Sequence, residues 1–426
     1  MSSEWSLQKI SALGDFDRGK SKHRPRDAAH LYGGPYPFIQ TGDITNASGR
    51  ITSHRQTYSE AGFAQSRLWP AGTLAITIAA NIAETALLTF PACFPDSVVG
   101  FIPDPKKADV RFIGYLFQAM RKQVKSHAYG SAQENINLEV LRKLEFPIPP
   151  LTTQVEIADY LSLLDDRITL LRETNVTLEA IAQALFKSWF VDFDPVRTKM
   201  QGRVPEGMDE ATAALFPDAL VESELGLMPK GWEVQSLDTI ATFLNGLALQ
   251  KFPPTGTNDL PVIKIAQLRK GDTVGADQAS RNIKPEYIVK NGDVLFSWSG
   301  SLEVEIWCGG EGALNQHLFK VTSNDFPKWF YFFWTRHHLA DFRQTAASKA
   351  TTMGHIQRGH LSAAKVCVPT EGVLTAATAV LGPIVEMLIQ NSLQAQTLAT
   401  LRDALLPRLI SGQLRLPEAE VMLDNA

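Results

Sequence analysis

Cysteine is scarce in this chain of 426 residues, and its three copies, Cys93, Cys308 and Cys367, lie far apart without a C-x-x-C pair. This spacing excludes a disulfide framework, argues against a structural zinc site and is typical of a reducing compartment. The N-terminal stretch MSSEWSLQKI also lacks the apolar core of a signal peptide. We therefore expect a cytoplasmic protein.

Long apolar runs are rare as well. The best candidate for a membrane span, residues 74–94, carries one charge, Glu84, but it contains three threonines and one asparagine and is interrupted by Pro91. These polar residues and the proline favour a buried strand pair or strand–helix element over a membrane span. We expect no contact with a membrane.

Motifs for catalysis are missing. Neither the [DN]-P-P-[YF] loop with which an adenine methyltransferase holds a flipped base nor an H-x-x-x-H metal pair occurs. Residues 95–96 (PD) and 104–106 (DPK) imitate a nuclease motif, but Pro103 and Pro105 argue against a central strand that carries such ligands. We expect no catalytic residue, no metal site and no cofactor.

An excess of positive charge is missing too. The formal net charge is −4, so any binding of nucleic acid must depend on local patches. Residues 205–226 contain acids and no base, whereas residues 18–26 (RGKSKHRPR) contain bases and no acid. The basic run consists of Arg18, Lys20, Lys22, His23, Arg24 and Arg26.

Part of this basic run also matches a nucleotide-binding pattern. Residues 14–21 (GDFDRGKS) fit the P-loop consensus G-x-x-x-x-G-K-[ST]. A working P-loop follows a buried strand and opens a helix, but Pro25 stands shortly after Ser21 and no helical apolar period follows. We therefore prefer the phosphates of DNA as the partners of these cations. A P-loop nucleotide-binding enzyme remains the alternative interpretation.

The chain is an internal repeat. A constant shift along the sequence aligns LEVLRKLEFPIPP (138–150) with RGHLSAAKVCVPT (358–370). With small insertions, EWSLQKISAL also aligns with GWEVQSLDTI, and YPFIQTGDI with LPVIKIAQL. The pattern predicts an α+β fold in which two mixed α/β globular domains are each followed by a long helix.

We place these segments at residues 1–150 (first domain), 151–195 (helix), 196–230 (acidic linker), 231–370 (second domain), 371–412 (helix) and 413–426 (tail). Within the domains, the apolar spacing of residues 108–124 and 326–342 predicts one helix in each copy.

Both long helical segments carry a heptad seam with one polar member, Asn175 in the first and Asn391 in the second. An antiparallel coiled coil that sets these two amides opposite each other satisfies both. Thr153 and Glu156 fit a capping box at the start of the first helix. Pro383 and Pro407 should start, kink or end the second helix, so we expect its heptad seam to extend only from about residue 384 to residue 405.

This arrangement resembles the specificity subunit of type I restriction-modification enzymes. The resemblance extends over nearly the whole chain, through RGKSKHRPR, YPFIQTGDI, ALFKSWFVDFDPV, LNQHLFKV, TTMGHIQRGHLSAAKVCVP and LRDALLPRLISGQL. It implies two target-recognition domains that each read half of a split, asymmetric site on double-stranded DNA, and a helical spacer that sets the unread gap. It also implies two methyltransferase subunits and motor-nuclease restriction subunits as partners, with no chemistry in the chain itself. A DNA-binding scaffold outside restriction is a further alternative.

Loop residues that suit phosphates or base edges are the candidate reading residues. Besides the basic run, the first domain offers Gln40 and Thr41 after a strand. The second domain offers the corresponding turn and two further loops: Lys264, Gln267, Arg269, Lys270, Ser297, Ser299, Ser301, Thr351, Thr352 and His355. Because the basic run has no counterpart in FLNGLALQKFPP, the two half-sites should differ.

Overall fold

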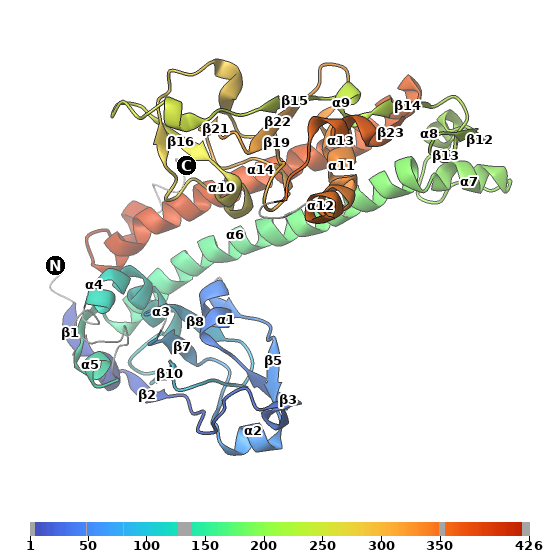
Figure 1. The fold of residues 1–426 in the computed structure, drawn as a ribbon. Helices are drawn as coiled ribbons and strands as arrows, with labels where there is room; N and C mark the ends of the chain where they lie inside the picture. The colour runs from blue at the N-terminus through green and yellow to red at the C-terminus, as the bar shows by residue number, and fades with distance from the viewer. Residues whose placement is uncertain (1–4, 48, 80, 127–137, 349–353, 420–426) are drawn as a thin grey trace. The chain divides into compact units, whose positions relative to one another are not determined.

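The computed structural model describes residues 5–47, 49–79, 81–126, 138–348 and 354–419 (Figure 1). The chain forms two compact units. The N-terminal unit comprises residues 1–170 and 395–426, and the central unit comprises residues 171–394. Each unit therefore contains a part of both long helices. Thr351 and Thr352, two of the candidate reading residues, lie outside the described residues.

Two sheets and a terminal strand pair build the N-terminal unit. The five-stranded sheet has the order β2 (Gly14–Arg18), β10 (Val98–Pro103), β7 (Leu74–Thr77), β8 (Thr85–Leu88), β4 (Arg50–Ile51). The four-stranded sheet has the order β5 (Gln56–Tyr58), β3 (Tyr32–Phe38), β9 (Ala92–Cys93), β6 (Leu68–Trp69). β1 (Ser6–Lys9) pairs antiparallel with β11 (Glu145–Ile148). The helices are α1 (Thr41–Asn46), α2 (Glu60–Ala64), α3 (Val110–Ala119), α4 (Arg121–Ser126) and α5 (Leu138–Lys143).

The central unit repeats this plan. One sheet has the order β15 (Thr242–Asn245), β22 (Leu318–Thr322), β19 (Val294–Ser297), β20 (Val304–Ile306). The other has the order β17 (Gln278–Ala279), β16 (Leu260–Ile263), β21 (Gly312–Leu314), β18 (Ile288–Val289). β14 (Glu233–Ser236) pairs with β23 (Lys365–Val368). The helices are α9 (Leu237–Ile240), α10 (Ile265–Lys270), α11 (Lys328–His337), α12 (Leu339–Ser348) and α13 (Arg358–Ala363).

The internal repeat is therefore confirmed at the level of topology. Both units place equivalent strands in the same order, and α5 with β11 recurs as α13 with β23 at the shift that the sequence predicts. The run 74–94 forms strands β7, β8 and β9, as its polar residues predicted. The single helix expected in each domain is instead a pair, α3–α4 and α11–α12, broken at Met120 and at His338.

The first long helix, α6 (Leu151–Phe186), buries the seam that its heptads predict, including Leu161, Leu164 and Ile168. The expected capping box at Thr153 is wrong, because the helix already begins at Leu151. Buried Gln154 secures this end instead: its side chain donates to the carbonyls of Pro149 and Lys107, both at 3.0 Å. Carbonyl groups away from water need a donor, and this amide supplies one to each.

The second long helix, α14 (Glu371–Ile410), continues through Pro383 and Pro407, so the expectation that these prolines start or end it is wrong. An interior proline costs about 3 kcal/mol, and burial of one helix face offsets that cost. The buried side chains around Pro383 recur at every fourth position: Val373, Ala377, Leu381, Val385 and Ile389. By length and composition alone, α14 is also apolar enough to cross a membrane. In this structure the buried side chains around Pro383 pack in the core of the central unit.

The acidic segment 196–230 is folded, not a solvated connection. A π-helical turn (Lys187–Val191) and Phe193, in a left-handed conformation (φ 57°), end α6. The segment then forms α7 (Asp194–Met200), α8 (Glu210–Leu215) and the hairpin β12 (Leu220–Ser223)–β13 (Gly226–Pro229). Val196, Phe216 and Met228 enter the central core. These few apolar residues anchor the segment to the core. The acidic composition of the segment gave no indication of this packing.

In the central unit the two long helices meet at the pair of amides that the heptad count places together. Asn391 Nδ2 donates to Asn175 Oδ1 at 2.9 Å. Asn175 Nδ2 donates to the carbonyl of Leu388 at 2.9 Å and to Ser392 Oγ at 3.0 Å. The two amides therefore bind each other directly, and a shifted register would leave polar atoms against aliphatic side chains.

Asn175→Ala should lower the free energy of unfolding by about 1–3 kcal/mol, because it removes the partner of the half-buried Asn391 amide. The double variant Asn175→Ala/Asn391→Ala should lose less than the sum of the losses of Asn175→Ala and Asn391→Ala, since neither amide is then left unpaired. Chemical denaturation of the four proteins of this cycle measures the coupling. Strictly additive losses would contradict the pairing.

Candidate nucleic-acid interface

The P-loop match does not have P-loop geometry. Residues 14–18 are strand β2 itself, paired along its length with β10, and the next described helical turn after Ser21 begins only at Ala29. Gly19 is required for close packing: a Cβ atom there would lie 2.3 Å from the carbonyl oxygens of Phe94 and Pro95. The glycine thus allows two backbones to cross, and no helix N-terminus follows it directly to hold a phosphate.

The basic loop between β2 and β3 is anchored through its backbone. Gly19 N donates to Val98 O at 2.8 Å, and Ser66 Oγ donates to Lys20 O at 2.9 Å. Further along, His23 N donates to Gln65 Oε1 at 2.7 Å. Anchors at several points hold the loop in one conformation, so its side chains project in defined directions.

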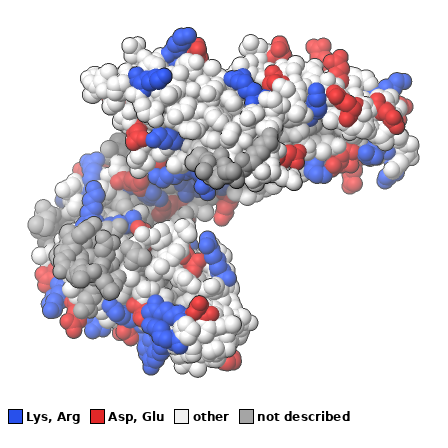
Figure 2. All heavy atoms as spheres, viewed as in Figure 1, with Lys and Arg blue, Asp and Glu red and all other residues white. Residues whose placement is uncertain are grey.

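The cations of this loop fall into two groups. Lys20 and Lys22 are exposed and make no ion pair with the described residues, which suits them to phosphates. Arg24 and Arg26 instead share a carboxylate, Asp96, for which the sequence indicated no role in DNA binding. Figure 2 shows Lys and Arg gathered over this part of the N-terminal unit. Arg18 is half-buried at the end of β2, and its Nε is buried without a hydrogen bond to the described residues.

Gln40 lies between β3 and α1 as the N-cap of this short helix, as expected for a loop residue, whereas Thr41 is the first residue of the helix and not part of a loop. Asp43 caps this helix by accepting from Gln40 N at 2.8 Å. The Gln40 side chain donates to Gln56 Oε1 at 2.5 Å, and the largely exposed Arg55 lies 3.7 Å from Asp43. Gln56 and Arg55 extend the candidate surface, and no spacing in the sequence points to them because they stand on a different strand and loop.

Of the corresponding residues of the central unit, Gln267, Arg269 and Lys270 lie on the helix α10 and not in the expected turn. Lys264 precedes it and pairs with Asp277, and Lys270 lies 3.1 Å from Asp272. Gln267 Oε1 accepts from Lys264 N at 3.3 Å. Arg269 is exposed and has no ion pair among the described residues, so it is the cation best placed to meet a phosphate here.

Ser297 is removed from the candidate reading residues. It is fully buried, donates to Ser301 O at 2.7 Å and accepts from Glu303 N at 2.7 Å. Thr77 has the same function in the first copy of the repeat, where it accepts from Glu84 N at 3.0 Å. These hydroxyls join the two strands of a hairpin, β7–β8 or β19–β20. A seryl residue after apolar strand residues cannot be assigned to loop or core from sequence alone.

Ser299 and His355 belong to a polar and aromatic cluster in the central unit. Ser299 is buried, forms a β-bridge with His355, and its Oγ lies 2.9 Å from His317 Nδ1. Trp298 Nε1 donates to Asn245 Oδ1 at 3.0 Å, and the indole packs against the rings of both histidines. His317 was overlooked as a candidate, although LNQHLFKV carried the family resemblance.

The two units place different side chains at the same topological position. Arg18 opposes Val99 in the β2–β10 pair, and Asn245 opposes Phe319 in the β15–β22 pair. The glycine that follows each donates to the equivalent carbonyl, Gly19 to Val98 and Gly246 to Leu318. One loop then continues with a run of cations and the other with apolar residues. The same scaffold therefore presents two chemically different surfaces.

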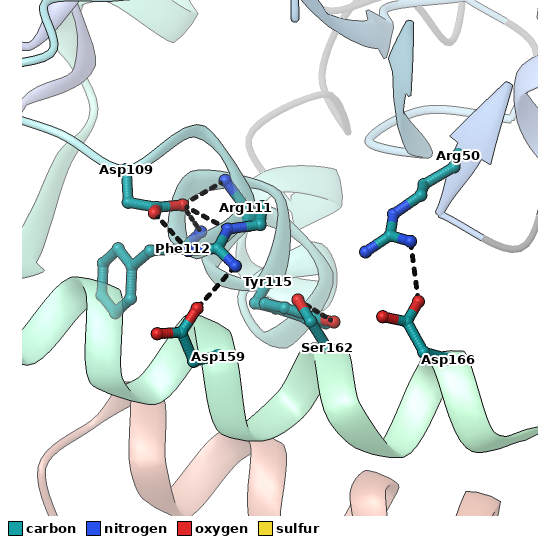
Figure 3. Close-up of polar contacts among 8 residues, drawn as sticks. All are labelled: Arg50, Asp109, Arg111, Phe112, Tyr115, Asp159, Ser162 and Asp166. Carbon is teal, nitrogen blue, oxygen red and sulfur yellow. Dashed lines mark hydrogen bonds and ion pairs between the residues drawn. The ribbon is translucent and has the colours of Figure 1, made fainter. Parts of the chain in front are cut away.

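Ion pairs join the sheet domain of the N-terminal unit to α6 (Figure 3). Asp109 caps α3 and holds Arg111, whose Nη1 lies 2.6 Å from Asp159 on α6. One turn further, Tyr115 donates to Asp165 at 2.6 Å, and burial raises the pKa of its hydroxyl well above the ordinary value. Arg50 pairs with Asp166 at 2.7 Å. Contacts at successive turns fix the domain that carries the candidate surface to the helix within this unit.

Comparisons with known proteins bear on the family of the chain. The family model of the type I restriction modification DNA specificity domain matches residues 2–180 and 229–372. The MjaIX specificity subunit of Methanocaldococcus jannaschii is 26% identical over 97% of this chain and 94% of its own length.

Two further matches cover less of the chain or show only the fold. The HindI specificity subunit of Haemophilus influenzae is 26% identical over 66% of this chain and 71% of its own length. The crystal structure of the S subunit from M. genitalium shares the fold, with a TM-score of 0.56 at 16% identity over 95% of this chain and 96% of that one. Because the family model covers most of the sequence in two copies, the chain belongs to the type I restriction-modification DNA specificity family.

Proposed function

We propose that the chain reads a bipartite, asymmetric site on double-stranded DNA, with one half-site for each unit and an unread gap between them. The observation that carries this proposal is the repeated sheet order with different side chains after β2 and β15. A repeated scaffold with unequal loops suits two unequal half-sites, since contacts to base edges specify the sequence whereas contacts to phosphates only position the protein.

In this proposal the chain contributes no chemistry and is a scaffold for two methyltransferase subunits and for motor-nuclease restriction subunits in the cytoplasm. Several large apolar side chains are exposed on both long helices, and in this proposal the partner subunits cover them. On α6 they are Leu163, Leu170, Val176 and Ile181, and on α14 they are Val380 and Met387. In the described residues no group of three or more His, Cys, Asp and Glu side chains is arranged to hold a metal ion.

Selection from a library of random duplexes tests the proposed function, with the chain in complex with its methyltransferase partners. The expected result is two different short motifs at a fixed separation, with no base preference between them. A palindrome, a single uninterrupted motif or no enrichment at all would each overturn the proposal. The mass of the complex, measured in the same preparation, reports whether one chain binds two methyltransferase subunits.

A further inference from the structure

Asp96, on the segment between β9 and β10, is an acid that pairs with two arginines of the basic loop. Arg26 Nη2 donates to both of its carboxylate oxygens, at 2.7 and 2.9 Å, and Arg24 Nη2 lies 3.8 Å away. The three side chains remain roughly half exposed: 40% for Asp96, 48% for Arg26 and 55% for Arg24. Ion pairs this exposed contribute only about 0–1 kcal/mol to stability, so the arrangement is not explained by a need to hold the fold together.

A carboxylate in this position is unfavourable for binding phosphates, because its negative charge repels them and neutralises the neighbouring cations. It does fix the direction of an arginine. The backbone around Arg26 is also held, since Tyr32 Oη donates to the Arg26 carbonyl at 2.8 Å and Ala28 N donates to the carbonyl of Pro25. The Nε and Nη1 of Arg26 make no hydrogen bond to the described residues. The two carboxylate oxygens lie in nearly the same direction from Nη2, so one of its hydrogens can serve both. The other Nη2 hydrogen, together with that of Nη1 or Nε, then forms the parallel donor pair that bidentate recognition needs.

We infer that Asp96 is a positioning residue that orients Arg26 to read a guanine in the half-site of the N-terminal unit. Guanine presents two acceptors, O6 and N7, in the major groove, and an arginine fork matches them. Lys20 and Lys22, which lack such a carboxylate, then provide the contacts to phosphates. The inference rests on the proposed function and adds to it the base and the residues responsible.

Within the described residues, the equivalent position of the second repeat copy does not carry this arrangement. The residue equivalent to Asp96 is Gln316, which precedes β22 as Asp96 precedes β10. The side-chain oxygen of Gln316 accepts from Asn315 Nδ2 at 3.2 Å, and its carbonyl accepts from Trp298 Nε1 at 3.1 Å. An amide beside His317 replaces the carboxylate and its arginines. The guanine contact is therefore assigned to the half-site of the N-terminal unit.

Asp96→Asn tests the inference, because it keeps the shape of the side chain and removes the charge that holds Arg26. Binding is measured for duplexes carrying each base at every position of the selected half-sites. Arg26→Ala should reduce discrimination for guanine at one position by about 5- to 100-fold. Asp96→Asn should reduce it at the same position by about 3- to 10-fold, without weakening the affinity for unrelated DNA. Asp96→Glu should restore part of it.

Asp104→Asn is the matched control, since Asp104 is a partly exposed acid of the same unit that pairs with Lys107 at 3.4 Å. It should leave every base preference unchanged, and thermal unfolding of each variant verifies the fold. A wild-type motif without guanine in either half, or unchanged preferences in Asp96→Asn, would overturn the inference while the bipartite reading stands. If the wild-type complex selects no motif, the proposed function and the inference fail together.

Discussion

Phe190→Ala is expected to lower the free energy of unfolding of the central unit by about 3–5 kcal/mol, the largest effect of any single change considered for this chain. Phe190 is fully buried where the π-helical turn follows α6. Its ring lies 5.4 Å from that of Trp329 and 5.8 Å from that of Trp232, centroid to centroid. Truncation leaves a cavity among large rigid rings that cannot collapse to fill it.

Ile410→Ala is the matched variant at the equivalent position of the second repeat copy, where α14 ends in the core of the N-terminal unit. It should cost about 2–5 kcal/mol in that unit. Ser188→Ala, close to Phe190 and half-buried on the same turn, should cost much less. Denaturation followed by tryptophan fluorescence measures all three. A loss below about 1 kcal/mol for Phe190→Ala would show that the aromatic cluster is not a packed core.

The double variant Lys20→Ala/Lys22→Ala should weaken DNA binding to a similar degree for all sequences and reduce the salt dependence. Each lost phosphate contact lowers the slope of log K against log salt by about 0.9, so the expected reduction is about 2. Both lysines are exposed and free of ion pairs among the described residues. Fluorescence anisotropy over a range of salt concentrations gives the slope for specific and unrelated duplexes.

Lys106→Ala/Lys107→Ala is the control, because it removes the same charge from the other end of β2. Pro103 opposes Gly14, the first residue of that strand, whereas Lys20 lies beyond its last residue. The control should change the slope by less than half as much. Equal changes in both double variants would mean that the effect comes from net charge and not from contacts at the basic loop.

The features that repeat in the sequence were predicted best. The constant shift between the two copies aligned the segments that form β11 and β23, and the heptads placed Asn175 opposite Asn391, because both features follow from periods that can be counted in the sequence. The helix start or end expected at Pro383 was wrong, since the buried aliphatic face of α14 outweighs one missing hydrogen bond. Tertiary packing therefore overrides the low helix propensity of proline where the buried face of the helix is large.

The candidate site was predicted less well than the fold. The basic run was recognised, but Asp96 is distant from Arg24 in the sequence and meets it only because β9 leads into β10 beside Gly19. Ser297 was proposed as a reading residue and is part of a hairpin core. Which hydroxyls and carboxylates face outward depends on strand register, and register depends on pairings between distant segments.

The N-terminal unit is built from two segments at opposite ends of the chain, so it can complete its fold only after both have been translated. Its core includes Leu405, Leu406 and Leu409 from the end of α14, and Tyr160 on α6 donates to the carbonyl of Ala419 at 2.9 Å. These residues leave the ribosome long after the rest of the unit, whereas residues 171–394 form a continuous segment. At about 5–20 residues per second, the wait lasts on the order of ten seconds to a minute. The first domain to be synthesised is thus the last to be completed.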